Sequence, residues 1–412
     1  MTLPNKFIQL GCWNNMNYDK NNSCIYSTMN KLRKYLKEET EKPNFIVVSG
    51  DNYYPDKETI LTTKKKYIYP KRLIDGFNIL KESSNIVPIY MLLGNHDLET
   101  GLNDTDNIFM EDLARETPNN CTILAEECKI STKNDDLHYL DFKSIELHNN
   151  TLLLMIDTNI YTPEAEEKYL PCYKKFLNDG KLCVENKNIE ESKLTIEKLQ
   201  TSQFTKISTA IENFSNDKIN NIIIVGHHPI TGLKYKSKEV KALNDIPLFI
   251  DVLRNIHILI NEKSSDVKYF YLCSDLHLYQ KGIVTLLNPS EKLPPMIINQ
   301  YIVGTGGTKL DPELPENYVT PTTFGSPYIT YNLITEIKKC GFLECIIDDS
   351  IPKFNFIQAD EEEDITTNGG KKSKKSKKSK KSKKSKKSKS KSKKSKKSKS
   401  KKSKSKSKKS KK

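Results

Sequence analysis

Five hydrophobic segments of this chain each end in side chains that can bind metal ions, and this repeated pattern constrains the fold more than any other feature. Each segment ends or directly follows a short apolar run of the kind that forms buried strands. The five are GCWNN (11–15), VVSGDNYYPD (47–56), YMLLGNHDLE (90–99), IIIVGHHPI (222–230) and YFYLCSDLHLY (269–279). Because loops at the carboxyl ends of strands in α/β proteins meet in one crevice, we expect these segments to form a single site.

The expected site combines carboxylates, imidazoles, an amide and a phenol. Taken singly, each piece is ordinary, because polar turns and histidines beside strands are usually structural. Together they favour a metal centre, since four of the seven histidines of the chain fall in these loops. Mixed oxygen and nitrogen ligands suit Zn²⁺, Fe or Mn²⁺ rather than Ca²⁺. The candidates are Asp51, Tyr54, Asn95, His96, Asp97, His227, His228, Asp275 and His277.

Strand and helix patterns alternate in the first half of the chain, whereas strands dominate the second half. This order predicts an α/β fold with two central sheets and helices outside them. Stretches 100–145 and 160–190 are polar and resemble surface insertions. We expect strands at 7–10, 45–49, 86–93, 151–156, 221–225, 267–273, 283–287 and 296–303, an antiparallel pair at 328–334 and 342–347, and helices at 23–39, 71–83, 189–214 and 246–262.

The end of the chain differs sharply in composition from the rest. Residues 371–412 are 27 lysines and 15 serines, so the formal charge of +15 belongs to this tail, and the first 370 residues hold 40 basic against 52 acidic side chains. A segment without apolar residues has nothing to bury, and its charges repel one another. We therefore expect a folded domain at 1–349, an acidic linker at 350–370 and a disordered tail at 371–412.

The location of the protein is predicted from what the sequence lacks. The first residues, MTLPNKFIQLGCW, show no signal peptide, and the apolar runs are too short to span a membrane. The nine cysteines favour reduced thiols in the cytoplasm or nucleus, although the pairs 121/128, 172/183 and 340/345 are candidate disulfides. Four arginines against 63 lysines indicate an AT-rich genome, as in some large DNA viruses, and a viral chain would lie in the virion.

The motifs and their order resemble the calcineurin-like metallophosphoesterase superfamily, and most closely its purple acid phosphatase branch. The resemblance covers most of residues 5–345. It implies a four-layer αββα sandwich of two mixed β-sheets flanked by helices, with two metal ions at the sheet edge. The matching motifs are GDNYYPD, LLGNHD, MIDT (155–158), GHHPI, a modified GHxH and YIVGTGG (301–307).

The resemblance also implies roles for the metal ligands. Asp51 would bridge the two ions, because a carboxylate can give one oxygen to each. Tyr54 matches the phenolate that distinguishes the purple branch, and His277 would join it at the first ion. Asn95 and His227 would hold the second ion.

Two neighbouring residues are the catalytic candidates, and the first of them matches a position of the family. His96 corresponds to the residue that binds the phosphoryl oxygens and protonates the leaving group. Asp97, beside it, would orient that imidazole.

Two ligand positions depart from the family. Asp275 stands where GHxH has its first histidine, a change that favours harder ions such as Mn²⁺. Cys12 stands where family members have an aspartate at the end of the first strand. Three interpretations remain open here: Cys12 is a soft metal ligand, the first metal site is weak, or the site is inactive.

The favoured hypothesis is a phosphoric ester hydrolase that cleaves phosphate monoesters, on a small molecule or a phosphoprotein, with a metal-activated hydroxide in a binuclear site. The alternative is a weak or inactive phosphatase fold that acts as a virion structural protein or binds nucleic acid or another polyanion through residues 371–412. The tail could equally be a solubilising arm.

Overall fold

The computed structural model of the chain describes part of the sequence, namely residues 3–14, 24–52, 54, 79–80, 82–83, 87–99, 142–178, 190–216, 218–243, 245–264, 266–287, 294–316, 318, 322–323, 328–348 and 351–359. The chain divides into two compact units, residues 1–363 and 364–412, and the description below concerns the first. The expected Lys/Ser tail and most of the helix expected at 71–83 lie outside the described residues.

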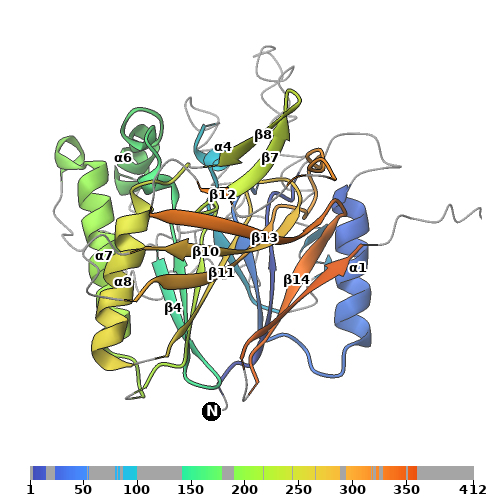
Figure 1. Ribbon diagram of the computed structural model, residues 1–412, viewed down its shortest axis with the longest axis horizontal. Coiled ribbons are helices and arrows are strands. Elements are labelled where there is room, and N and C mark those ends of the chain that lie inside the picture. Colours follow the sequence, from blue (N-terminus) through green and yellow to red (C-terminus); the bar gives the residue numbers. More distant parts are fainter. Residues whose placement is uncertain are drawn as a thin grey trace, which may run out of the picture. The chain divides into compact units, whose positions relative to one another are not determined.

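Two mixed β-sheets form the centre of this unit (Figure 1). The smaller sheet has the order β15-β14-β1-β2-β3, in which β1, β2 and β3 are parallel and the other pairs antiparallel. Its strands are β1 (Lys6–Leu10), β2 (Phe45–Ser49), β3 (Ile89–Leu92), β14 (Gly341–Ile346) and β15 (Lys353–Gln358).

The larger sheet has the order β12-β13-β10-β11-β9-β6-β5-β4, with a parallel centre running from β11 to β5. Its strands are β4 (Phe142–Leu147), β5 (Thr151–Ile156), β6 (Asn221–Val225), β9 (Lys268–Cys273), β10 (Tyr279–Leu286), β11 (Met296–Val303), β12 (Thr322–Thr323) and β13 (Ile329–Ile337). A separate antiparallel hairpin is made by β7 (Gly232–Lys236) and β8 (Glu239–Leu243).

The strands alternate their side chains between two cores, as the period of a strand requires. In β1 and β2, Phe7, Phe45 and Val47 belong to a core shared with residues of the larger sheet such as Val225 and Leu272. The residues between them, such as Ile8 and Val48, belong to a second core on the other face of the smaller sheet. The two sheets therefore pack face to face.

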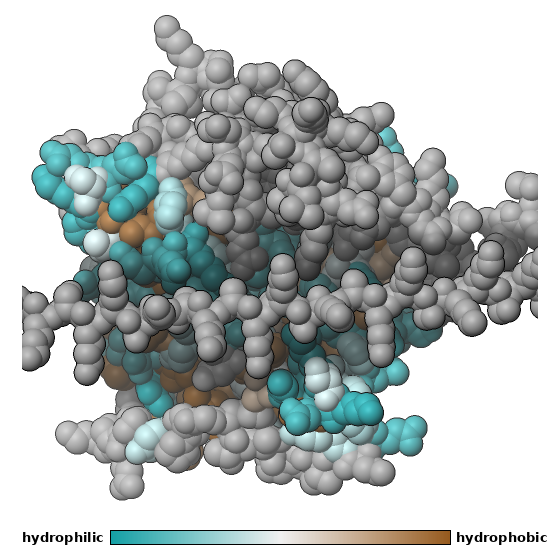
Figure 2. Space-filling view, turned by 90° about the horizontal axis from the view of Figure 1, so that it is seen from above, coloured by the Kyte–Doolittle hydropathy of each residue, from teal (hydrophilic) through white to brown (hydrophobic). Residues whose placement is uncertain are grey.

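Helices cover the two outer faces and complete four layers (Figure 1). On the smaller sheet lies α1 (Cys24–Glu38), which buries Ile25, Met29, Leu32 and Leu36 on one face, at the spacing that the sequence predicts. The larger sheet is covered by α7 (Ile196–Glu212) and α8 (Phe249–Lys263). The predicted αββα sandwich is confirmed. In the view from above, the described outer residues are mostly hydrophilic, and apolar ones lie deeper (Figure 2).

Short helical elements lie in the connections. They are α4 (Asn95–Glu99), η2 (Asn159–Tyr161), η3 (Ala165–Tyr169), α6 (Leu170–Asn178) and η4 (Glu191–Lys193). No helix of the described residues is long and apolar enough to cross a membrane.

Three sequence-based expectations are wrong. The strands predicted at 328–334 and 342–347 do not pair with each other, because the chain crosses between the sheets: β13 pairs with β10 and β14 with β1. The predicted linker at 350–370 begins with β15, whose Phe354 and Phe356 pack on the core between the sheets. The stretch 160–190, expected to be a surface insertion, buries several aromatic side chains in the core, namely Tyr161, Tyr169 and Tyr173.

The cysteines also differ from the expectation of reduced thiols. Cys24, at the start of α1, forms a disulfide with Cys340, in the turn before β14. Cys345 and Cys172 are free and buried, so the candidate pairs 340/345 and 172/183 are wrong, and the pair 121/128 lies outside the described residues. The 316 residues between the partners explain why spacing along the chain could not reveal the pair.

Candidate metal centre

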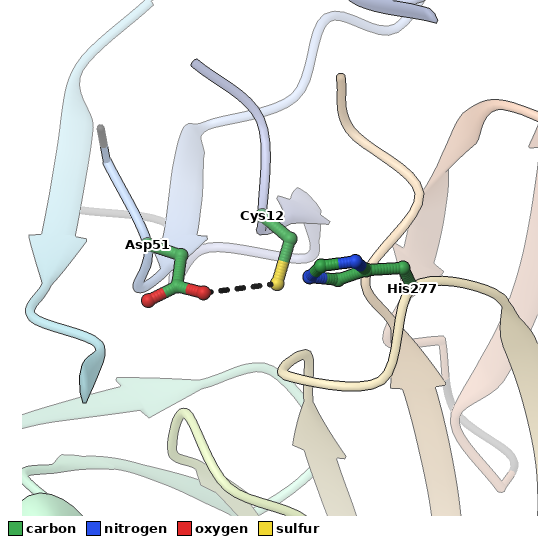
Figure 3. Close-up of side chains that lie close together, drawn as sticks. All are labelled: Cys12, Asp51 and His277. Atoms are coloured by element: carbon green, nitrogen blue, oxygen red, sulfur yellow. Dashed lines mark hydrogen bonds between the residues drawn. The ribbon is translucent and has the colours of Figure 1, made fainter. Parts of the chain in front are cut away.

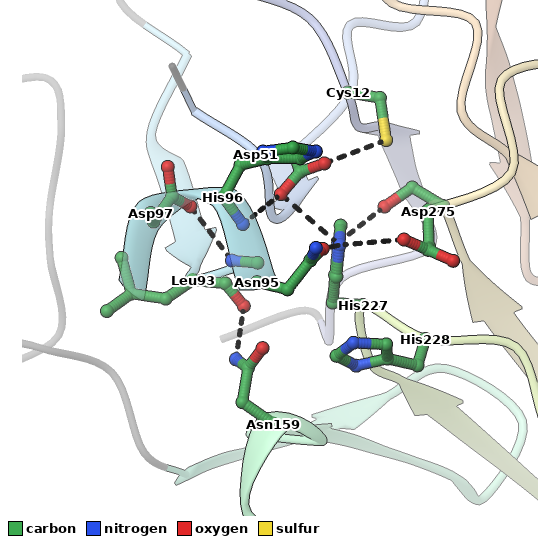
Figure 4. Close-up of polar contacts among 12 residues, drawn as sticks. Cys12, Asp51, Leu93, Asn95, His96, Asp97, Asn159, His227, His228 and Asp275 are labelled. Carbon is green, nitrogen blue, oxygen red and sulfur yellow. Dashed lines mark hydrogen bonds and ion pairs between the residues drawn. The ribbon is translucent and has the colours of Figure 1, made fainter. Parts of the chain in front are cut away.

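The predicted ligand loops converge at the carboxyl ends of strands from both sheets. Cys12 follows β1 and Asp51 follows β2, while Asn95 opens α4 just beyond β3. His227 follows β6, and Asp275 follows β9 in the larger sheet. Figure 4 shows these side chains pointing toward one another. The site therefore lies where the edges of the two sheets meet.

The first group of donors consists of Cys12, Asp51, Tyr54 and His277. Donor atoms of Cys12, Asp51 and His277 all lie within 4.8 Å of one another, and His277 points toward the cysteine sulfur (Figure 3). The Cys12 thiol donates to Asp51 Oδ2 at 3.7 Å. The Tyr54 hydroxyl donates to the same oxygen at 2.7 Å and lies 3.1 Å from His277 Nε2. Sulfur, carboxylate, phenol and imidazole thus face one point.

The second group consists of Asn95, His227, His228 and Asp275. His227 Nε2 lies 2.9 Å from Asn95 Oδ1 and 3.7 Å from Asp275 Oδ1. Donor atoms of His227, His228 and Asp275 lie within 4.8 Å of one another. This group holds the ligands that the resemblance implies, together with a second imidazole from His228, which is among the sequence candidates but has no role that the resemblance implies.

Asp51 belongs to both groups. Its Oδ2 contacts the first group, whereas its Oδ1 lies 3.3 Å from His227 Nε2 and accepts a hydrogen bond from His96 N at 3.1 Å (Figure 4). The side chain is fully buried. Each carboxylate oxygen is therefore directed at a different set of donors.

Three of these residues have a left-handed backbone. The φ angles are 51° at Cys12, 54° at Asp51 and 47° at Asp275. Non-glycine residues seldom adopt this conformation, and it persists only where surrounding contacts hold it. The sharp turn sends each side chain back across the end of its own strand into the site.

Neighbouring polar groups orient the histidines of the second group. His227 Nδ1 lies 2.8 Å from the Ser49 carbonyl and 3.0 Å from Ser274 Oγ, which leaves Nε2 for the site. His228 Nδ1 lies 3.0 Å from Thr158 Oγ1. Such contacts to the second ring nitrogen fix the orientation of metal-binding histidines. Sequence reasoning missed Ser274 and Thr158 as positioning residues, although both are polar residues inside the quoted motifs.

The protonation of the site follows from its burial. Burial, together with the charges of Asp51 and Asp275, raises the pKa of the Cys12 thiol well above its ordinary value. Burial and the Asp51 charge also raise the pKa of Tyr54. Burial opposes ionisation of Asp51, but His227 and His96 outweigh it and hold its pKa below the ordinary value. A cation entering the first group must therefore displace protons from sulfur and phenol.

His228 is already in the form that ligation requires. Burial, together with the neighbouring His227, lowers the pKa of His228 to about 4, so its imidazole is neutral at neutral pH. The donor set as a whole, with one carboxylate shared between two groups of imidazole, oxygen and sulfur donors, fits two metal ions.

The two predicted catalytic residues occupy the turn into α4. The half-buried His96 ring lies 4.9 Å from the Tyr54 ring, between centroids. Asp97 accepts hydrogen bonds from Gly94 N at 2.8 Å and from Asn52 N and Nδ2, each at 2.9 Å. Asp97 thereby joins the Asp51 loop to the Asn95 loop. That it also orients the His96 imidazole stays a prediction.

A comparison with models of protein families identifies the family of the chain. Residues 6–253, more than half of the chain, match the calcineurin-like phosphoesterase family. The chain therefore belongs to the calcineurin-like phosphoesterase family, whose members generally bind two metal ions. Membership of the purple acid phosphatase branch stays a prediction.

Among solved structures, one similar chain is described as "GAP50 the anchor in the inner membrane complex of Plasmodium". It has 13% sequence identity and a TM-score of 0.45, and the match covers 87% of this chain and 85% of that chain. A comparison with curated proteins finds no match.

Proposed function

We propose that the chain hydrolyses phosphate monoesters, carried by a small molecule or a phosphoprotein, at a binuclear metal centre. The observation that supports this most directly is the position of Asp51. Its two oxygens are directed at two separate groups of donors, as a bridging carboxylate requires. The family supplies the general class, a metal-dependent phosphoesterase.

The first ion would be held by the sulfur, phenol and imidazole of the first group, and the second by the amide, imidazoles and carboxylate of the second. The sulfur of Cys12 favours Zn²⁺ or Fe, whereas the carboxylate of Asp275 favours Mn²⁺ or another hard ion. When bound, the two ions would neutralise the phosphoryl oxygens and lower the pKa of the attacking water.

We assign to His96 the two remaining roles, which are binding of the phosphoryl group and protonation of the leaving group. Its backbone N–H is fixed by Asp51 Oδ1, and its half-buried ring lies beside Tyr54, at the edge of the two donor groups. A ring in this place would bind a phosphoryl oxygen and give its proton to the leaving oxygen. Asp97 would hold the Asp51 loop and the Asn95 loop together through its hydrogen bonds to Asn52 and Gly94.

The test measures bound metal and turnover together. Wild-type protein should bind up to two ions of Zn²⁺, Mn²⁺ or Fe and hydrolyse a generic aryl phosphate monoester in preference to the diester. Asp51→Asn should lose both properties, since Asp51 contacts both donor groups. His148→Ala is the matched control, because His148 is exposed in the turn between β4 and β5, at the end of β5 away from the site. Wild-type protein that stays inert with all three metals would contradict the proposal.

A further inference from the structure

The segment 304–311, which follows β11 and is called here the brace loop, lies directly against the Cys12 turn. Gly306 N donates to the Gly11 carbonyl at 3.1 Å, and Thr308 N donates to the Cys12 carbonyl at 3.1 Å. On its other side, Cys12 N donates to the Gly50 carbonyl at 3.1 Å. The left-handed turn that aims Cys12 into the site is therefore held from both sides by backbone hydrogen bonds.

The brace loop also holds the other end of the first donor group. Asp311 N donates to the His277 carbonyl at 2.8 Å, and His277 N donates to Asp311 Oδ2 at 3.0 Å. A side chain at Gly304 would place its Cβ 2.1 Å from the Leu276 carbonyl oxygen, so the loop and the His277 turn lie in close contact. One loop thus fixes two ligands of the first group that come from strands of different sheets.

Close contact between the brace loop and the Cys12 turn explains why positions 306 and 307 of the GTGG motif (304–307) are glycine. A Cβ at Gly306 would lie 2.7 Å from the Gly11 carbonyl oxygen, and one at Gly307 would lie 1.8 Å from the Trp13 carbonyl oxygen. A side chain at either position would push the brace loop away from the Cys12 turn.

Thr305 ties the brace loop to the disulfide. Its carbonyl accepts from Gly341 N at 3.1 Å, and its hydroxyl donates to the Gly341 carbonyl at 3.0 Å. Gly341 follows Cys340, and the sulfur of the partner Cys24 lies 3.3 Å from the Thr305 carbonyl oxygen. Thr305 is fully buried, so the disulfide and these bonds enclose it between α1 and β14.

The second donor group is held by other elements. His227 is oriented by Ser49 and Ser274, and His228 by Thr158. Each of these residues lies outside the brace loop. A change in the position of the brace loop therefore acts directly on Cys12 and His277 of the first group, but not on the contacts that orient the two histidines of the second.

We propose that Thr305 is a positioning residue for the first metal group, and that the Cys24–Cys340 disulfide anchors it. Together they hold the brace loop, which sets the separation of Cys12 and His277 and hence the metal affinity of that group. The inference rests on the proposed function, because it requires two metal sites that can be measured separately.

The test titrates the protein with Co²⁺ and follows two signals. A sulfur-to-cobalt charge-transfer band reports only the group that contains Cys12, and the total bound cobalt reports both groups. Thr305→Val removes the hydroxyl bond to Gly341 and keeps the shape of the side chain. It should weaken Co²⁺ binding in the first group by about 10- to 100-fold, as loss of a positioning contact does at other metal sites. Binding in the second group, whose histidines are held by other elements, should change much less.

Three further proteins complete the design. Thr305→Ser restores the hydroxyl and should restore the band. The double variant Cys24→Ala with Cys340→Ala removes the anchor and should act like Thr305→Val. Thr231→Val is the control, because Thr231 is buried and its hydroxyl has no hydrogen-bond partner among the residues that the structure describes.

The outcomes separate the inference from the proposed function. Equal Co²⁺ affinity of the first group in Thr305→Val and wild type overturns the inference and leaves the proposed function standing. A parallel loss from both groups also overturns it, because the effect would then be a general loosening. Wild-type protein that binds no cobalt at all overturns both.

Discussion

Replacing Cys12 by aspartate tests whether a proton bound to the thiol competes with the metal ion in the first group. The Cys12→Asp variant should bind Mn²⁺ more tightly than wild type at pH 7 and hydrolyse phosphate monoesters faster with that ion. The backbone does not resist the change, because the φ angle of 51° lies in the left-handed region that aspartate adopts more readily than most residues.

The expected size follows from competition between the metal and the proton. Burial, Asp51 and Asp275 hold the pKa of the Cys12 thiol well above 9.0. Each pH unit between that pKa and the working pH lowers the apparent metal affinity tenfold, so at pH 7 the proton reduces binding by at least about 100-fold. The ordinary pKa of an aspartate side chain is 3.8. At pH 7 a proton competes with the metal for that carboxylate only if its pKa rises by more than three units. We therefore expect a gain of about 100-fold for Mn²⁺, and a smaller gain for Zn²⁺, which binds thiolate well.

The chain carries its own reporter for this measurement. Trp13 is the only tryptophan, lies next to Cys12, and donates from Nε1 to Asn52 Oδ1 at 3.2 Å. Its fluorescence during metal titration should follow the first group. Wild-type affinity should rise with pH between about 6 and 9, while the affinity of Cys12→Asp should be nearly flat. Cys12→Ser, which keeps the size but offers no anionic ligand, should bind more weakly than both.

Two results would refute this reasoning. A wild-type affinity that does not change with pH would mean that no bound proton competes with the metal. Weaker Mn²⁺ binding by Cys12→Asp than by wild type at pH 7 would mean that the thiolate is the better ligand despite its proton.

Three further predictions concern other parts of the molecule. His96→Ala should lower turnover by about 10²- to 10⁴-fold while elemental analysis finds the metal content unchanged. Gly307→Ala should lower the free energy of unfolding in urea by about 1–3 kcal/mol, because its Cβ meets the Trp13 carbonyl. Burial opposes the charge of Glu344, but its hydrogen bonds and ion pair with Lys6 keep its pKa below 4.5. The stability that this charge contributes is fully present above pH 4.5 and is lost as the pH falls through the pKa of the folded state. Glu344→Gln should therefore flatten the acid side of a plot of the free energy of unfolding in urea against pH.

The parts of the fold that the sequence predicts well are those whose signal is local. β2, β5, β6 and β11 have the predicted bounds, because each is a short segment rich in β-branched and other apolar residues. The site loops follow the same rule, since each ligand motif directly follows such a run. Convergence of these loops then follows from the general geometry of parallel strands.

The parts of the fold that sequence reasoning misses depend on contacts between segments that lie far apart in the chain. β15 has the alternating sequence KFNFIQ, which fits an edge strand, but the polar residues around it hide the pattern. The crossing from β13 to β14 takes only three residues, 338–340, so a hairpin is the natural reading of the sequence. The disulfide and the bonds of Thr158 to the histidines join residues far apart in the chain, and no local pattern records them.

The structure also bears on why an unusual ligand can occupy the first position. Hydrogen bonds to Gly50, Gly306 and Thr308 hold the Cys12 turn through its backbone, so the turn does not depend on the side chain it carries. The scaffold would accept cysteine or aspartate without changing the fold. The thiol nevertheless points at Asp51 and His277 rather than into the apolar core beside it (Figure 3). A buried, polar-facing sulfur among carboxylate and imidazole donors is what a metal ligand needs, and it is a poor arrangement for a thiol that only fills space. Of the three interpretations of Cys12, we therefore favour the soft ligand, whose affinity depends on pH.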